Sequence, residues 1–301
     1  FTLSGAPWGN YSYIVHWQGS KVSEKVYSET ASVDRVVQAE VYSLRLSLKD
    51  SNGNLLQVQP SQVTLVAPNG TTLIISAYSI AQAQKGTWSV TSVVYEGTEV
   101  VPTPHPSVSL SGNYEWAIRC EVFSLSLSFE DSDGNLLQLQ PSQITIVAPN
   151  GTTLTINEYL IPQAQVGRWT LTSIIYQGSE VISEPTISTS LSSNYEWSIG
   201  CKVHSLTVEV RDFFGLPISG GRVNLYRDGA LVGSETTDGG GKAVFPQLSE
   251  GNYRMEASYI QTSTETILLT SSVTRRVTTI SYVIIGVILS LIHISEPTRP
   301  Y

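Results

Sequence analysis

The chain has 301 residues, a formal net charge of −8 at pH 7 and 14% charged residues, well below the quarter that globular proteins usually carry. Because binding to nucleic acid needs a basic face that neutralises phosphates, this acidic balance excludes nucleic acid as a partner. Ser, Thr, Val and Ile are abundant, which is typical of β-rich extracellular proteins.

The two cysteines, Cys120 and Cys201, occupy matching positions 81 residues apart. Equivalent points of stacked domains lie tens of ångströms apart, whereas a disulfide needs Cα atoms within about 7 Å. Two thiols at this spacing also make no zinc site. We therefore expect two small, partly buried free thiols, and we expect no cofactor and no catalytic metal.

An 81-residue repeat organises the chain. Residues 41–121 and 122–202 are identical at about 50 of 81 paired positions without a gap, and a looser third copy opens at Val203. The front enters partway through an earlier unit, because GNYSYIVHWQG at Gly9 matches GTWSVTSVVYEG at Gly86. The sequence thus predicts the C-terminal half of a truncated repeat (1–40), two full repeats (41–121 and 122–202) and a third unit (203–278). No flexible linker separates the units, which favours a semi-rigid rod.

Alternating apolar and polar residues within each repeat predict half-buried strands. In the second repeat the apolar positions of the first two strands are Leu125, Leu127, Phe129, Ile144, Ile146 and Ala148. The segments 131–135 and 149–151 carry Asp, Asn, Pro and Gly, which predict turns. Residues 157–165 are expected to be irregular.

A long hairpin about Gln177-Gly178 follows, and its alternation places Trp169, Leu171, Ser173 and Ile175 on one face. Seven or so short strands with turns every 8–12 residues indicate an antiparallel β-sandwich of Ig-like or prealbumin-like type. The fold class is therefore all-β, as tandem sandwiches.

The third unit carries a D-x-x-G-x-P turn at Asp212, Gly215 and Pro217, followed by Thr237-Asp238 with Gly241 and by a closing G-x-Y strand. In these residues it resembles the carboxypeptidase-regulatory-like, CnaB-like (transthyretin-like) β-sandwich over about 50 residues. The resemblance implies the fold and not a function, because such modules are spacers and binders in many settings. The whole arrangement is similar to archaeal membrane-anchored surface proteins built from these modules.

The C-terminal end is apolar from Ile280 to Ile292. We interpret 279–288 as the start of a truncated transmembrane helix, because the apolar run is shorter than the ~20 residues a bilayer needs. The tail 289–301, with LSLIHISEPTRP, resembles a translated sequencing adaptor, so no role is assigned to His293, Glu296 or Arg299. A single-pass anchor implies the membrane as a partner and a position at the cell surface.

Two turns offer alternating oxygen ligands of the kind that calcium prefers, namely Asp50, Asn52 and Asn54 in the first repeat and Asp131, Asp133 and Asn135 in the second. A complete calcium loop also wants a bidentate glutamate near its twelfth position, where this chain has Ser61 and Ser142. A simple hairpin turn is the favoured interpretation, and these residues remain weak calcium candidates.

Asn10, Asn69 and Asn150 begin N-x-Ser/Thr sequons and are candidate glycosylation sites. The Asn-Gly pairs at 69 and 150 are also ordinary turn residues, so turn chemistry alone explains them. Four tryptophans could stack on sugars if exposed, but their alternation with apolar neighbours favours the core; they are Trp88, Trp116, Trp169 and Trp197.

No catalytic pattern is present, since His16, His105 and His204 fall in different units without a partnered nucleophile or carboxylate. We therefore expect no enzyme activity in these residues. The favoured function is a surface stalk or adhesive protein whose partners are cell-envelope proteins or surface glycans. The alternatives are a spacer that carries an enzyme or solute-binding domain preceding Phe1, and a receptor ectodomain.

Overall fold

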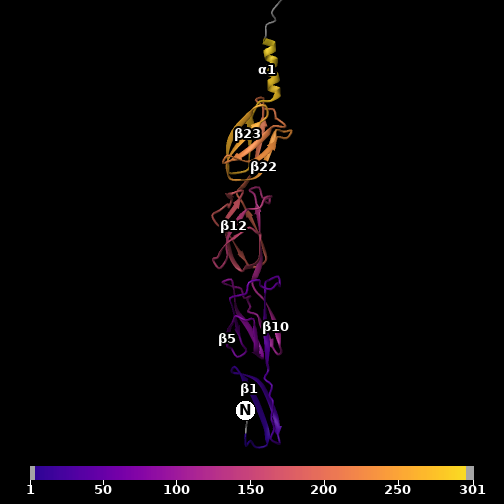
Figure 1. Ribbon diagram of the computed structural model, residues 1–301, viewed down its shortest axis with the longest axis vertical. Coiled ribbons are helices and arrows are strands. Elements are labelled where there is room, and N and C mark those ends of the chain that lie inside the picture. Colours follow the sequence, from indigo (N-terminus) through magenta and orange to yellow (C-terminus); the bar gives the residue numbers. More distant parts are fainter. Residues whose placement is uncertain (1–3, 296–301) are drawn as a thin grey trace, which may run out of the picture.

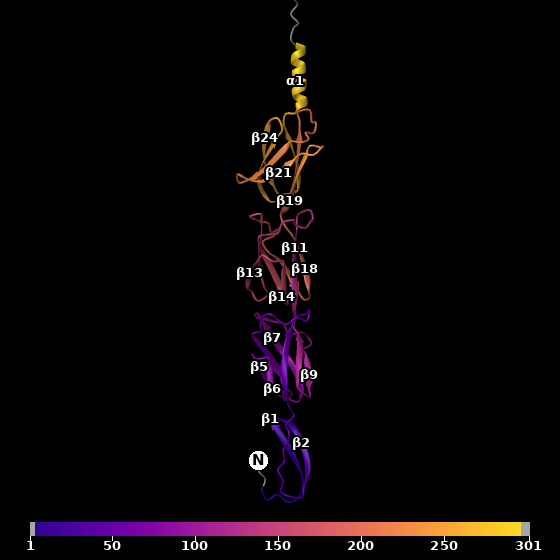
Figure 2. The ribbon, with the colours of Figure 1, turned by 45° about the vertical axis from the view of Figure 1, so that its right-hand side comes forward.

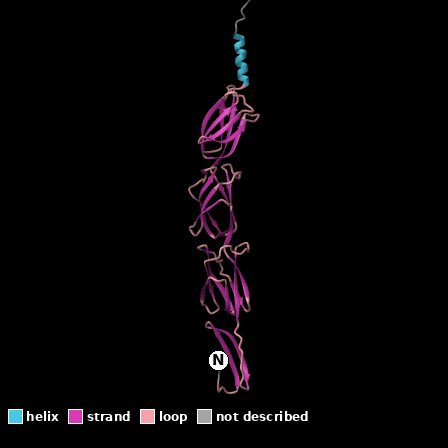
Figure 3. Cartoon of the chain, viewed as in Figure 1, coloured by secondary structure: helices cyan, strands magenta, loops and turns pink. Residues whose placement is uncertain are grey.

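The computed structural model describes residues 4–295, in which three β-sandwiches follow a β-hairpin and precede a single helix. Figure 1 shows these parts stacked end to end in chain order, with the N-terminal hairpin at one end and the helix at the other. Figure 2, from another side, shows the same column, so the units do not fold back on one another. Figure 3 shows that strands make up almost all of the regular structure.

The front of the chain is a two-stranded antiparallel hairpin of β1 (Gly9–Trp17) and β2 (Ser20–Glu29). Its turn uses Gln18 and Gly19 at φ 46° and 81°, the left-handed pair that a tight two-residue hairpin requires. The sequence match at Gly9 aligns this hairpin with residues 86–97 of the first full repeat, and its origin in a truncated repeat stays a prediction.

The first two sandwiches have the same eight strands at an offset of 81 residues. In the first they are β3 (Val41–Lys49), β4 (Gln62–Val66), β5 (Thr72–Ile75), β6 (Ser79–Gln84), β7 (Gly86–Tyr95), β8 (Thr98–Glu99), β9 (Ser107–Leu110) and β10 (Tyr114–Arg119). In the second they are β11 (Val122–Glu130), β12 (Gln143–Val147), β13 (Thr153–Ile156), β14 (Leu160–Gln165), β15 (Gly167–Tyr176), β16 (Ser179–Glu180), β17 (Ile187–Leu191) and β18 (Tyr195–Gly200).

Each of these two sandwiches packs a three-stranded sheet against a five-stranded one. In the first sandwich the three-stranded sheet has the order β10-β3-β6, and the other sheet has the order β5-β4-β7-β8, with β9 as a further strand paired to β7. In the second sandwich the orders are β14-β11-β18 and β13-β12-β15-β16, with β17 paired to β15. The third sandwich has the orders β22-β19-β25 and β21-β20-β23-β24. Its strands are β19 (Val203–Arg211), β20 (Arg222–Arg227), β21 (Ala230–Thr236), β22 (Lys242–Ser249), β23 (Gly251–Ser258), β24 (Thr262–Leu269) and β25 (Val273–Thr278).

The expectation of purely antiparallel sheets is wrong in one respect. The first and last strands of every unit pair in parallel: β3 with β10, β11 with β18, and β19 with β25. Because these two strands run in the same direction, the chain enters a unit at one end and leaves it at the other. Parallel closure therefore makes the units stack into a column.

The segment expected to be irregular, 157–165, contains strand β14, which pairs antiparallel with β11. A register shift between Phe123 and Leu125 interrupts this pairing, so neither strand has the unbroken alternation by which a strand is recognised in a sequence. The same shift recurs between β3 and β6.

The cores confirm the predicted inward positions of the first two strands and the core placement of Trp88, Trp116, Trp169 and Trp197, all of which are buried. The predicted face of β15 is wrong beyond its middle: Ile174 and Tyr176 are buried instead of Ser173 and Ile175. A register shift against β12 between Thr145 and Ile146 inserts one residue and reverses the alternation.

The apolar C-terminal segment forms helix α1 (Tyr282–Ser295). The expected start at Thr279 is wrong by three residues, because Ser281 caps the helix by accepting a hydrogen bond from the Ile284 amide (3.3 Å). The helix runs past Ile288, where the predicted span stopped, and no helix among residues 4–295 is long and apolar enough to cross a membrane. Residues 296–301 of the adaptor-like tail lie outside the described range.

Candidate functional site: the junctions between units

The calcium-like turn of the first repeat is closed by its own N–H groups. Asp50 Oδ1 accepts hydrogen bonds from the backbone amides of Asn52 and Asn54, both at 2.9 Å, and Oδ2 accepts one from Asn54 Nδ2 at 3.2 Å. Gly53 completes the turn at φ 90°, a conformation that a side chain would strain. Asp131 holds the same bonds with Asp133 and Asn135 in the second repeat.

A glutamine of the following unit then binds each of these turns. Gln163 of β14 donates from Nε2 to Asp50 Oδ2 (3.2 Å) and to the Leu55 carbonyl (2.9 Å). Its Oε1 accepts a hydrogen bond from the Gln57 amide at 2.8 Å. We call this set of three bonds the glutamine latch. Because one partner is a carbonyl and another is an N–H, the orientation of the Gln163 amide is fixed.

The latch recurs at the next junction with the same partners. Gln247 of β22 donates to Asp131 Oδ2 (3.3 Å) and to the Leu136 carbonyl (2.8 Å), and it accepts from the Gln138 amide at 2.7 Å. Both glutamines are buried. The two junctions are thus built by one rule, although the third unit is only loosely related in sequence.

In the third unit the corresponding aspartate, Asp212, binds the start of the helix. Ser281 Oγ donates to Asp212 Oδ2 at 2.9 Å while it caps α1. We refer to Asp50, Asp131 and Asp212 as the turn aspartates. Each one holds its own turn with Oδ1 and the next segment of the chain with Oδ2.

The turn aspartates are buried carboxylates that stay ionised. Burial alone would raise the pKa of Asp50, but hydrogen bonds from Asn54, Gln163 and Asn52 outweigh it and lower the pKa below its ordinary value. The pKa values of Asp131 and Asp212 are lowered against burial in the same way. The latches are therefore charge-assisted at neutral pH.

The other two calcium candidates also contact the following unit. Asn52 Oδ1 accepts from Asn194 Nδ2 at 2.6 Å, and Asp133 Oδ2 accepts from Ser272 Oγ at 2.7 Å. The six candidates therefore lie at the junctions as two separate turns. No group of three or more His, Cys, Asp or Glu side chains in the described range is placed to hold a metal ion.

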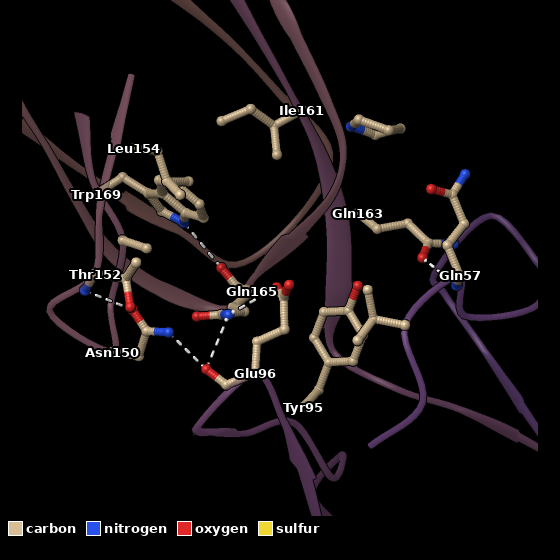
Figure 4. A pocket seen from close by; sticks show the side chains of 13 residues that line it. Gln57, Tyr95, Glu96, Asn150, Thr152, Leu154, Ile161, Gln163, Gln165 and Trp169 are labelled. Atoms are coloured by element: carbon tan, nitrogen blue, oxygen red, sulfur yellow. Dashed lines mark hydrogen bonds between the residues drawn. The ribbon is translucent and has the colours of Figure 1, made fainter. Parts of the chain in front are cut away.

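A second contact between the first two sandwiches lies at the turn of the β7–β8 hairpin (Figure 4). Asn150 Nδ2 donates to the carbonyl of Glu96 at 2.6 Å, and Gln165 Nε2 donates to the Glu96 carboxylate at 3.0 Å. Thr98 completes the contact by donating to Gln165 Oε1 at 2.8 Å. Glu96 has φ 45°, so its left-handed backbone directs the carbonyl at the next unit.

The front hairpin meets the first sandwich in the same manner. Asn69 Nδ2 donates to the Gln18 carbonyl at 2.9 Å, and Gln84 bonds to the carbonyls of Trp17 and Gln18 and to the Ser20 hydroxyl. Gln18 takes the place of Glu96, with φ 46°. This hairpin has no aspartate turn, and Gln82, the counterpart of Gln163, is exposed.

The three sequons therefore differ in their surroundings. Asn69 and Asn150 donate with the nitrogen to which a glycan would be linked, each to the unit before its own. Asn10 is exposed on β1. Asn10 is thus the sequon that a glycan can occupy without entering a junction, and occupancy stays a prediction.

The junction between the second and third sandwiches keeps the glutamine latch, but the other side-chain contacts there differ from those at Glu96. His204 Nδ1 lies 2.8 Å from Ser132 Oγ, and His204 Nε2 lies 3.3 Å from a carboxylate oxygen of Glu250. Tyr176 donates to the carbonyl of Gln247 at 3.3 Å. His204 is thus a packing residue of a junction, while His16 lies in β1 and His105 between β8 and β9, so the fold does not bring the three together.

A cavity of ≈ 440 Å³ opens at the junction of the first two sandwiches. Figure 4 shows Tyr95, Glu96, Gln163, Gln165 and Trp169 among the side chains that line it. Gln165 bonds to Glu96, and Gln163 bonds to the first sandwich as the glutamine latch. The cavity therefore belongs to the junction.

Cys120 and Cys201 are buried free thiols, as the repeat spacing predicts. They lie in the two-residue connections that join β10 to β11 and β18 to β19. Burial raises the pKa of each to about 12, with Glu99 adding to the rise at Cys120 and Glu180 at Cys201. Both thiols are therefore protonated and unreactive at neutral pH.

The latch glutamines were not singled out from the sequence. A signal was present, because Pro162-Gln163 and Pro246-Gln247 are equivalent pairs, each ahead of a strand that a glycine opens (Gly167 and Gly251). Glutamine has no preferred structural role, however, and only the position of the next unit shows what these two bind.

No family model and no curated protein sequence matches this chain. Similar solved structures include the Bacillus anthracis TIE protein, with 17% identity over 85% of this chain and 53% of that one, at a TM-score of 0.27. A streptococcal ancillary pilin (10%, 78% of this chain and 98% of that one, TM-score 0.30) and BcpA, the major pilin subunit of Bacillus cereus (9%, 79% and 99%, TM-score 0.25), are two others. The chain spans about half the length of the TIE protein.

Proposed function

We propose that this chain is a non-catalytic, extracellular stalk at a cell surface, in which the β-sandwiches set the length of the stalk and hold its two ends at a fixed separation. The observation that carries the proposal is the repeated junction: two glutamine latches, with matched partners, lock three consecutive sandwiches. A protein that needed its domains to move would not join each pair by charge-assisted hydrogen bonds at a buried carboxylate.

The connections between the sandwiches support the same function. Only Cys120 and Glu121 separate β10 from β11, and only Cys201 and Lys202 separate β18 from β19. The main chain also bonds across the junctions, as Ser51 donates to the Val122 carbonyl at 2.9 Å and Ser132 to that of Val203 at 2.8 Å. A two-residue connection with bonds on both sides leaves little freedom to bend.

We further propose that the stalk is attached to a membrane through helix α1. From Gly286 to Leu291 every residue of α1 is exposed, so apolar side chains are exposed on successive faces of the helix. A helix that is apolar all round is stable in a lipid environment. Its 14 residues extend about 21 Å, which reaches into a ~30 Å hydrocarbon core without crossing it.

The stalk is tested by small-angle X-ray scattering of the full chain held in a detergent that covers α1. A variant that lacks the glutamine latch and the Gln165 side-chain bonds of one junction, Gln163→Ala with Gln165→Ala, is compared with the unaltered chain. The expected result is a fixed maximum dimension for the unaltered chain and a broader, shorter distance distribution for the variant. An unaltered chain that already bends as freely as the variant would overturn the proposal.

A further inference from the structure

The aspartate turn of the third unit is apolar where the first two are polar. The residues after Asp50 and Asp131 are Ser51-Asn52 and Ser132-Asp133, whereas Phe213-Phe214 follows Asp212. Both phenylalanines are exposed, Phe213 by 69% and Phe214 by 61%. Two adjacent exposed phenylalanines in a rigid turn are costly in water.

The polar residues of the first two turns have partners in the unit that follows. Ser51 donates to Asn194, Asn52 accepts from it, and Asp133 accepts from Ser272. In the third unit the segment that follows is α1, and it engages the turn through Ser281 and Asp212. The two phenylalanines therefore face whatever surrounds the base of the helix.

Further apolar side chains meet at the same end of the unit. The ring of Tyr259 packs edge-to-face on that of Tyr282, with centroids 5.5 Å apart, and Thr279 donates to the Gln261 carbonyl at 2.8 Å. The turn between β23 and β24 thus lies beside the helix start, as the aspartate turn does. We call the exposed apolar residues of this end the collar: Phe213, Phe214, Leu216, Tyr259, Ile260 and Tyr282.

We propose that the collar is a membrane-contacting surface, which seats the end of the stalk in the headgroup region of a lipid bilayer; this rests on the attachment proposed for α1. The helix decides between lipid and protein as the occupant. A second copy would cover one stripe of α1, whereas exposed apolar residues run through Val287, Ile288, Leu289, Leu291 and Ile292 on successive faces. Ser290 donates its hydroxyl to the Gly286 carbonyl (2.9 Å), so this hydroxyl is satisfied within the helix and can lie in lipid.

The composition of the collar fits the boundary between water and hydrocarbon. Tyrosine rings are amphipathic and gather at membrane interfaces, and phenylalanine adds apolar area. One nearby carboxylate, Glu209, lies 3.3–3.8 Å from three cations, Arg211, Lys242 and Arg276, so this cluster keeps a positive charge. The apolar and aromatic side chains of the collar are expected to bind a zwitterionic bilayer, and the positive charge adds to the binding where the lipid is anionic.

The experiment places an environment-sensitive fluorescent label on a cysteine at the collar of the full chain. Phe213→Cys is the probe, and Leu268→Cys is the control, since Leu268 is 62% exposed and pairs with Asn252 at the junction end of the same unit. The buried native thiols do not compete for the label. Phosphatidylcholine vesicles are added, and both flotation and label emission are measured.

The expected result is a blue-shifted emission, shielded from an aqueous quencher, for the label at 213 only, in chains that float with the vesicles. Flotation without that shift would refute membrane contact by the collar and would leave the attachment through α1 supported. No flotation would refute both proposals. A shift that appears without vesicles and grows with protein concentration assigns the collar to a second copy instead. Phe213→Ser with Phe214→Asn is expected to lower the vesicle partition coefficient about tenfold, and unchanged partitioning overturns the proposal.

Discussion

Replacing Gln163 by alanine removes one glutamine latch and leaves the two sandwich cores intact. Three hydrogen bonds disappear, at 2.8, 2.9 and 3.2 Å, and Asp50 Oδ2 loses its partner from the next unit. At about 1 kcal/mol for each bond, the junction between the first two sandwiches loses about 3 kcal/mol. The Gln57 amide, whose partner is Gln163, becomes free to exchange with solvent.

Hydrogen exchange measured by mass spectrometry reads this loss directly. A change of about 3 kcal/mol corresponds to about a 100-fold faster exchange at Gln57 if exchange proceeds through opening of the junction. The Gln138 amide, which Gln247 holds at the other junction, is the control within the same chain. Gln82→Ala is the matched variant, because Gln82 is the repeat equivalent and is exposed. Equal exchange at Gln57 in the two variants would refute the latch.

Three other changes test the same junctions. In the unaltered chain Gln247 Nε2 lies 3.3 Å from the Asp131 carboxylate, and Asp131→Asn replaces that acceptor by an amide donor. Gln247 cannot flip to relieve the clash of two donors, because two other hydrogen bonds fix its amide. The midpoint of thermal unfolding is therefore expected to fall by about 5 °C or more. Because their pKa values are lowered in the folded chain, the turn aspartates contribute stability that is fully present above the unfolded-state pKa of about 4 and is lost as the pH falls toward the folded pKa values. The midpoint of thermal unfolding is therefore expected to stay constant from about pH 7 to pH 5 and to fall below about pH 4, and a midpoint that rises below pH 4 would contradict this. Cys120 and Cys201, with pKa values raised to about 12, resist a thiol reagent at pH 8 until denaturant is added, and rapid labelling of the native chain would contradict their burial.

The repeat and its alternation were sufficient to predict the sandwiches and most of their cores, because buried and exposed positions differ at every second residue. They failed where the backbone gains a residue. The register shift opposite β15 moves Ile174 and Tyr176 inward, and nothing in the run from Trp169 to Tyr176 marks that position. A shift of this kind is set by the partner strand, so a single strand's sequence does not show it.

The junctions were harder to predict than the cores because their chemistry is shared between units. The spacing of Asp50, Asn52 and Asn54 suggests an ion, and the structure puts backbone amides and Gln163 at the same carboxylate. A calcium site and a hydrogen-bonded turn would use the same carboxylate oxygens of Asp50. Only the contact between units, about 110 residues apart in the sequence, distinguishes them.

The third unit shows which parts of a junction depend on the neighbour. Asp212 keeps the hydrogen bonds of its own turn, as Asp50 and Asp131 do, because every unit needs the turn. The residues beyond it change from polar to aromatic at the one place where the next segment is an apolar helix instead of a sandwich. If these residues served only the turn, the aromatic pair would be equally expected in all three units. Its restriction to the helix end indicates that the surroundings of the helix, and not the turn, determine which residues stand there.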